Sequence, residues 1–154
     1  MSSDIFLLKP ALVDACKVVL QQRINHATEA MNAAQESANG EEKSSAGDKY
    51  ETSRAMGHRD RDMYAQQLAE AQKEMTKLNA LNINQRYNKI QSGAVIAVDN
   101  MIYFIASGIG KIEAEGQTIM VISPLSPIAK LLIGKEKGDT FTFNGSVKTI
   151  GDIA

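Results

Sequence analysis

The chain has 154 residues, and its 17 lysines and arginines against 18 aspartates and glutamates give a formal net charge of −1. That balance excludes a protein that coats DNA or RNA by neutralising its phosphates. Apolar residues make up 44% of the chain, which favours a folded protein, but no apolar run approaches the roughly 20 residues of a membrane span. The single cysteine excludes an internal disulfide, and no secretory signal is evident, so we expect a cytoplasmic protein.

Glycine and proline divide the chain into two halves of different character. No glycine precedes Gly40, whereas eight of the eleven glycines lie from Gly93 onward, and no proline lies between Pro10 and Pro124. Long sequence without proline favours helix, and β-branched residues among glycines favour strands and turns. The sequence therefore predicts an α+β protein with a helical first half and a β-rich second half, joined by a polar segment at 83–91.

The helical half carries two apolar stripes at spacings of three and four residues. The first helix is expected to begin near Pro10, and turn-forming residues interrupt the pattern over 39–49. The stripes predict an antiparallel coiled-coil hairpin over 1–82, with arms of about 30 residues that reach roughly 45 Å. Such a hairpin buries little surface, so its base must lean on the second domain. The stripe residues are Val13, Cys16, Leu20, Ile24, Ala27, Met31, Ala34 and Ala38, then Tyr64, Leu68, Ala71, Met75 and Leu78.

The second half, 92–154, predicts a small domain of short strands and one short helix. The expected strands are 94–99, 101–106, 118–122, 140–143 and 147–150, and the expected helix is 128–133. Ser126 is suited to cap that helix and Pro127 to occupy its first position, while Gly108 to Gly110 is expected to form a turn. Cys16 lies on an apolar stripe, so it is interpreted as a packed core residue and not as a nucleophile.

Acidic residues gather at the expected hairpin turn, where Glu41, Glu42, Asp48 and Glu51 lie near its end. Arg54, His58 and Arg61 follow at spacings that share one helix face. One interpretation is a solvated loop, with a helix cap and i to i+4 charge pairs beyond it. The other is a metal-binding tip near 40–51 with a basic strip behind it that holds a phosphate chain.

The C-terminal half of the sequence resembles a known signature. Residues 126–139, SPIAKLLIGKEKGD, resemble the characteristic run of the bacterial GreA/GreB transcript cleavage factors, and 93–98 resemble the opening strand of the same domain. Gly47, Asp48 and Glu51 keep the family's Gly-Asp-x-x-Glu spacing at the tip. Arg59 and Asp60 lie where the family usually has an arginine–glutamate or lysine–glutamate pair.

The resemblance implies a transcription elongation factor that binds bacterial RNA polymerase through its secondary channel. It implies an FKBP-like domain over 92–154 that docks through Ser126 and Pro127, and a coiled coil that carries Asp48 and Glu51 to the polymerase active site. These carboxylates would help hold a Mg²⁺ ion there, while Arg54 and Arg59 face the nascent RNA 3′ end. The isolated protein would hold no cofactor, bind no nucleic acid or membrane alone, and have no enzymatic activity, because the polymerase hydrolyses its own backtracked RNA.

Residues 52–55, Thr-Ser-Arg-Ala, depart from the family's usual continuation after the tip. This departure keeps open a Gre-like regulator that occupies the secondary channel without stimulating cleavage. A peptidyl-prolyl isomerase is a weaker alternative, because that activity needs an aromatic pocket and the chain has no tryptophan. A plain coiled-coil dimer through 11–81 is the third alternative.

Overall fold

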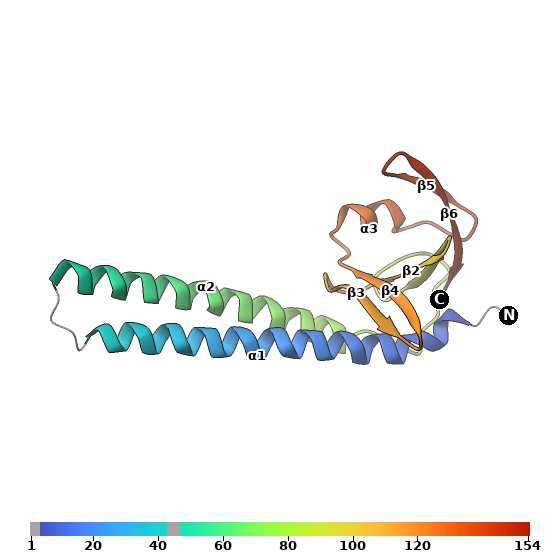
Figure 1. Ribbon diagram of the computed structural model, residues 1–154. Coiled ribbons are helices and arrows are strands. Elements are labelled where there is room, and N and C mark those ends of the chain that lie inside the picture. Colours follow the sequence, from blue (N-terminus) through green and yellow to red (C-terminus); the bar gives the residue numbers. More distant parts are fainter. Residues whose placement is uncertain (1–3, 43–46) are drawn as a thin grey trace. The chain divides into compact units, whose positions relative to one another are not determined.

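The computed structural model describes the backbone of residues 4–42 and 47–154 and the side chains of 4–37, 39 and 55–154. The chain divides into two compact units (Figure 1). One unit contains the chain up to Val19 together with Thr76–Ala154, and the other is Leu20–Met75. The sequence composition predicted a helical hairpin up to 82, a linker over 83–91 and a second domain from 92. The two compact units are defined by packing instead, and their boundaries lie within the two long helices. The expectation that the hairpin base leans on the second domain is confirmed, because both helix bases belong to the unit that holds the sheet.

The helical half consists of a short 3-10 helix and two long α-helices: η1 (Ile5–Leu8), α1 (Lys9–Glu42) and α2 (Gly47–Asn79). The side chain of Asp4 caps η1 by accepting a hydrogen bond of 3.0 Å from the backbone N–H of Phe6. The predicted interruption over 39–49 is too long, because α1 continues to Glu42 and α2 begins at Gly47. Within α1, Gln35 Nε2 donates to Asn39 Oδ1 over 2.9 Å, an i to i+4 bond of the kind that supports a helix.

The α+β class with a helical hairpin ahead of a small sheet domain is confirmed. In the Leu20–Met75 unit, α1 and α2 run antiparallel and side by side (Figure 1). Leu20, Ala27 and Ala71 are buried on the predicted stripes, while the other described stripe residues of this unit are half-buried. In the other unit Val13, Cys16 and Leu78 are buried as well. Ala38 lies outside the residues whose side chains are described.

The sheet has six strands in the order β3-β4-β2-β1-β6-β5. β2 and β4 run parallel, with Ile102 opposite Ile119, and every other neighbouring pair among these strands is antiparallel. The buried apolar core is aliphatic apart from a few aromatic rings, and it includes Ile96, Ile105 and Phe141. The strands are β1 (Val95–Val98), β2 (Met101–Ile105), β3 (Gly110–Ala114), β4 (Gln117–Ile122), β5 (Thr140–Phe143) and β6 (Ser146–Ile153).

Strand β3 is not among the predicted strands, and its first residue, Gly110, was expected to lie in a turn. The strand has no fully buried residue, because it lies at the sheet edge and exposes Lys111 and Glu113. Its turn signal is the pair Glu115 and Gly116, both with positive φ, at 52° and 74°. Two successive residues with positive φ are typical of a tight hairpin turn, and here they join β3 to β4.

The predicted linker at 83–91 is fixed to the sheet unit by backbone hydrogen bonds. Ile90 N–H donates to Lys135 O over 2.9 Å, and Gly134 N–H donates to Ile90 O over 2.8 Å. Ile90 itself is buried in the core cluster. The segment that leaves α2 is therefore held against the chain that follows the short helix α3 (Pro127–Leu132).

Candidate functional site: the hairpin tip and the surface of α3

The predicted cap of α3 is confirmed in detail. Ser126 Oγ accepts a hydrogen bond of 3.3 Å from Ala129 N–H and donates one of 2.8 Å to Ser123 O. Pro127 occupies the start of the helix, where its missing N–H costs nothing. Ser123 Oγ in turn accepts from Leu125 N–H over 3.1 Å. The loop before α3 therefore has its own hydrogen bonds, and these fix the conformation in which Ser126 and Pro127 are presented.

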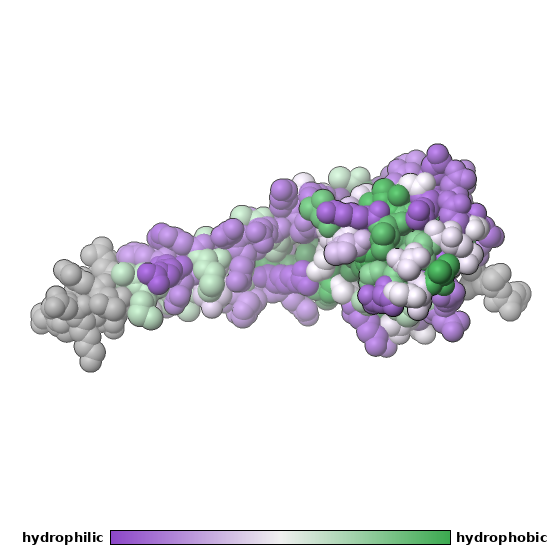
Figure 2. All heavy atoms as spheres, turned by 90° about the horizontal axis from the view of Figure 1, so that it is seen from above, coloured by the Kyte–Doolittle hydropathy of each residue, from purple (hydrophilic) through white to green (hydrophobic). Residues whose placement is uncertain are grey.

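The loop and α3 leave several apolar side chains in solvent. Leu125 is 76% exposed, Leu131 39% and Ile133 41%, and Pro127 is exposed beside them in the sequence. The opposite side of the helix is anchored, because Ala129 and Leu132 are fully buried in the core. We call Leu125, Pro127, Leu131 and Ile133 the α3 surface. Figure 2 shows hydrophobic residues at the surface of the sheet unit. Neighbouring exposed apolar residues of this kind can mark a site of interaction with another protein.

The predicted tip lies mostly outside the described side chains. Asp48 and Glu51 belong to the beginning of α2, but their side chains, like those of Glu41, Glu42 and Arg54, are not among those described. The pairing of the two carboxylates therefore remains a prediction. Among the residues whose side chains are described, no group of three histidines, cysteines, aspartates or glutamates could hold a metal ion.

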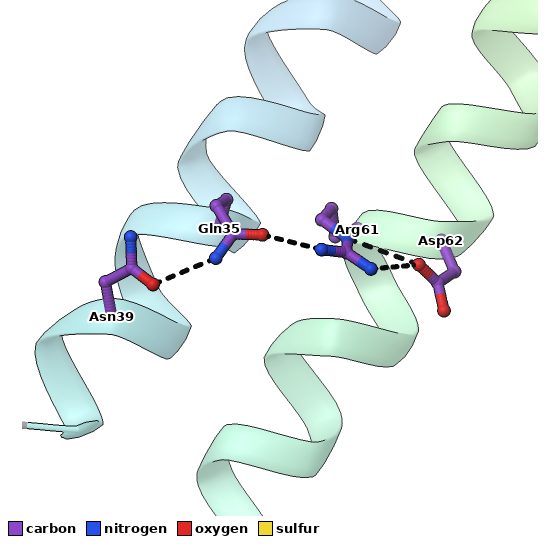
Figure 3. Close-up of polar contacts among 4 residues, drawn as sticks. All are labelled: Gln35, Asn39, Arg61 and Asp62. Carbon is purple, nitrogen blue, oxygen red and sulfur yellow. Dashed lines mark hydrogen bonds and ion pairs between the residues drawn. The ribbon is translucent and has the colours of Figure 1, made fainter.

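Two arginines behind the tip, Arg59 and Arg61, differ in exposure and in contacts. Arg59 is exposed, and its RNA-facing role stays a prediction. Arg61 is half-buried and contacts Gln35 of the neighbouring helix and Asp62 of its own (Figure 3). The expected charge pairs at i to i+4 are replaced, for Arg61, by a contact with the adjacent Asp62 and a hydrogen bond across the hairpin. Arg61 is thus engaged within the hairpin.

A second cluster, missed by the sequence analysis, surrounds Lys9 at the first turn of α1. The lysine is 1% exposed, and its Nζ donates to Gln85 O over 2.8 Å. Nζ lies 4.6 Å from the ring centroid of Tyr87 and 5.5 Å from that of Phe6. Burial, together with a smaller effect of the positive charge of Arg86, lowers the pKa of Lys9 to about 8.

Arg86 closes this cluster from the solvent side. Its guanidinium lies 4.1 Å from the Phe6 ring centroid and forms an ion pair with Asp4, and the hydrogen bond from Arg86 lowers the pKa of that carboxyl group. A lysine at a helix start normally reaches solvent, so no local pattern marks it as buried. In the sequence, only the aromatic residues Phe6 and Tyr87 could have indicated that the Lys9 amine is enclosed.

Cys16 is buried, as expected from its place on the stripe. Burial raises the pKa of its thiol to about 11, so very little of the reactive thiolate forms near neutral pH. This agrees with the interpretation of Cys16 as a packing residue.

Comparison with known proteins assigns no family. No protein-family model matches the chain. No curated protein matches it significantly. A solved structure described as that of the transcription factor Gfh1 aligns with 88% of this chain and 89% of its own, at 14% sequence identity and a TM-score of 0.38. That score is too low to establish a shared fold. Within the described residues, no helix is both long and apolar enough to traverse a bilayer.

Proposed function

We propose that this protein is a transcription elongation factor that binds bacterial RNA polymerase through its secondary channel and stimulates cleavage of backtracked RNA. The sheet unit docks on the polymerase through the α3 surface, and the hairpin enters the channel. The protein itself is an accessory factor, and the polymerase performs the hydrolysis.

The observation that carries this proposal is the α3 surface. Ser126 and Pro127, the positions that match the docking residues of the Gre signature, form the start of a well-capped helix. Exposed Leu125, Leu131 and Ile133 lie around them in the sequence. An apolar surface on a rigid, hydrogen-bonded support is suited to bind another protein, since little order has to be gained on binding.

The tip supplies the second half of the proposal. Asp48 and Glu51 are three residues apart at the start of α2, so their carboxylates can share one side of the helix. Mg²⁺ in enzymes that act on phosphates is commonly bound by one or two carboxylates, with water and phosphate as its other ligands. Two acids can therefore suffice if the polymerase supplies the remaining ligands. In two-metal hydrolysis the ions stabilise the attacking and leaving oxygens.

We expect Pro127→Asp to weaken polymerase binding at least tenfold, or about 1.4 kcal/mol. The substitution puts a charge on the α3 surface, and that charge would lose its hydration in the interface. The fold should survive, because aspartate is favourable in the first turn of a helix. Binding is measured by fluorescence anisotropy with labelled protein, and the fold is checked by the far-ultraviolet circular dichroism spectrum.

Val147→Asp is the matched control, because Val147 is an exposed apolar residue on β6, outside the α3 surface. It should bind like the wild type. Equal affinity of a folded Pro127→Asp variant would remove the α3 surface from the interface.

The function itself is tested by adding the pure protein to a backtracked elongation complex and reading both binding and RNA cleavage. Binding with cleavage supports the proposal. Binding without cleavage identifies the regulator that occupies the channel but does not stimulate hydrolysis, the alternative that residues 52–55 favour. Absence of binding overturns both.

A further inference from the structure

Arg61 occupies a position in α2 that the hydrophobic pattern reserves for an apolar residue. The seam of α2 runs at alternating spacings of four and three residues, and Arg61 stands second in it. The seam positions are Gly57, Arg61, Tyr64, Leu68, Ala71, Met75 and Leu78. In coiled coils a single polar residue at such a position lowers stability but specifies the register in which the helices pair.

The guanidinium of Arg61 is held from both helices. Nη1 donates to Gln35 Oε1 of α1 over 2.9 Å, while Nε and Nη2 donate to Asp62 Oδ1 over 3.2 and 2.8 Å. Gln35 Nε2 donates in turn to Asn39 Oδ1 over 2.9 Å. Figure 3 shows this line of contacts crossing from one helix to the other. Because Asp62 and Asn39 orient the two central side chains, the bond between Gln35 and Arg61 forms at one relative position of the helices.

Apolar packing specifies the register only weakly in this part of the hairpin. From Thr28 toward the tip, no α1 residue with a described side chain is fully buried. On α2 between Ala55 and Glu70, the only fully buried residue is Gly57, which has no side chain. A seam of alanine, glycine and half-buried residues discriminates less between registers than a seam of fully buried, closely packed side chains does. The polar contact discriminates between such registers, because a shift would leave Arg61 without Gln35.

We propose that Arg61 and Gln35 are positioning residues that fix the register of α1 against α2, and thereby the place where α2 begins. This inference rests on the proposed function, since the first residues of α2 include Asp48 and Glu51. In that function a shift of one turn moves the start of α2 by about 5 Å along the helix axis, which exceeds the tolerance of a metal-binding pair.

The register is measured on the isolated protein by pulsed electron–electron double resonance, which reports the distance between two spin labels. Ser37→Cys and Ala55→Cys place the labels on exposed residues of the two helices, and Cys16 is buried and poorly reactive. The parent protein should give one narrow distance distribution. Arg61→Met, which fills the seam with an apolar chain, should add a second population whose distance differs from the first by up to about 5 Å, the rise of one helical turn.

Lys73→Met is the matched control, because it removes a positive charge from an exposed residue of the same helix. It should keep the single population. Arg61→Met should also melt no lower than the parent, because a polar residue at a seam position of a coiled coil lowers stability and an apolar one restores it. A lower melting temperature with one unshifted population would show a purely structural role and overturn the inference.

Gln35→Glu tests the pair from the other side. It gives Arg61 a charged acceptor, and the amide of Asn39 can turn to donate, so the distribution should stay single. Gln35→Leu should broaden it, as Arg61→Met does. A single population in both Arg61→Met and Gln35→Leu would overturn the proposed role of the pair.

The cleavage assay separates this inference from the function on which it rests. If the wild type does not stimulate cleavage, the proposed function fails, while the spin-label result still decides the register. If the wild type is active and Arg61→Met shows two registers, its stimulated cleavage should fall at least tenfold with polymerase affinity within twofold of the wild type. Unchanged cleavage with two registers would overturn the positioning role.

Discussion

An elongation complex stalled by backtracking should keep its RNA intact when the added protein carries both Asp48→Asn and Glu51→Gln. The amides keep the size of the side chains but remove both negative charges, and a neutral amide is a much poorer ligand for Mg²⁺. If the acids help hold the ion, stimulation should fall to the level of polymerase alone. The rate of RNA shortening on a denaturing gel measures this, at a protein concentration that saturates the complex.

The same variant should still bind polymerase and compete with the wild type, because the α3 surface is unchanged. Its free energy of unfolding should change by no more than about 0.5 kcal/mol per site, apart from any lost cap, since surface substitutions usually have small effects. Glu41→Gln with Glu42→Gln is the control: it removes the same charge just before the matched motif and should reduce cleavage far less. Wild-type cleavage by the Asp48 and Glu51 variant would contradict the metal-holding role and favour the regulator that does not stimulate cleavage.

The elements that the sequence predicts well are those whose causes lie within a few residues. The start of α1 near Pro10 and the cap of α3 by Ser126 depend on local hydrogen bonds and on the fixed φ of proline. The stripes that contain Leu20 and Ala71 follow directly from the period of the α-helix. Of the α3 surface, only Pro127 was predicted, together with the cap residue Ser126, because the exposure of Leu125 and Ile133 depends on which face of the helix the sheet covers.

The features that the sequence did not predict depend on distant parts of the chain. Strand β3 is defined by its pairing with β4, with Ile112 opposite Ile119, and has little apolar signal of its own. Arg61 looks like a solvated helix residue until Gln35 of the other arm is placed beside it. Local pattern cannot supply such pairings, because they come from chain segments many residues apart.

Lys9 illustrates the same limit and has a consequence for stability. Its Nζ is buried against a backbone carbonyl and two aromatic rings, and its charge gains no carboxylate partner among the contacts of the described residues. Burial disfavours the charged form, so the pKa of Lys9 is about 8 in the folded protein, against an ordinary value of 10.5. That difference alone corresponds to roughly 3 kcal/mol. Cation–π attraction by the two rings and solvent screening around exposed Arg86 reduce the expected effect to about 1–2 kcal/mol.

We therefore expect the free energy of unfolding to rise with pH between about 8 and 10.5, relative to a variant without this amine. In that window the folded protein has released the proton of Lys9 while the unfolded chain retains it, so the unfolded state binds more protons and stability increases with pH. Below pH 8 Lys9 is charged in both the folded and the unfolded state, and the full cost of burying the charge is present.

Lys9→Met keeps the apolar stem and removes the amine, so comparing urea unfolding of the two proteins at pH 7 and pH 10 isolates the contribution of the amine. Between pH 7 and pH 10, the free energy of unfolding of the wild type should rise by about 1–2 kcal/mol relative to that of Lys9→Met. Lys111→Met, at an exposed position of β3, should follow the wild type. If the Lys9→Met and wild-type stabilities remain parallel from pH 7 to 10, Lys9 is not a buried charge in solution.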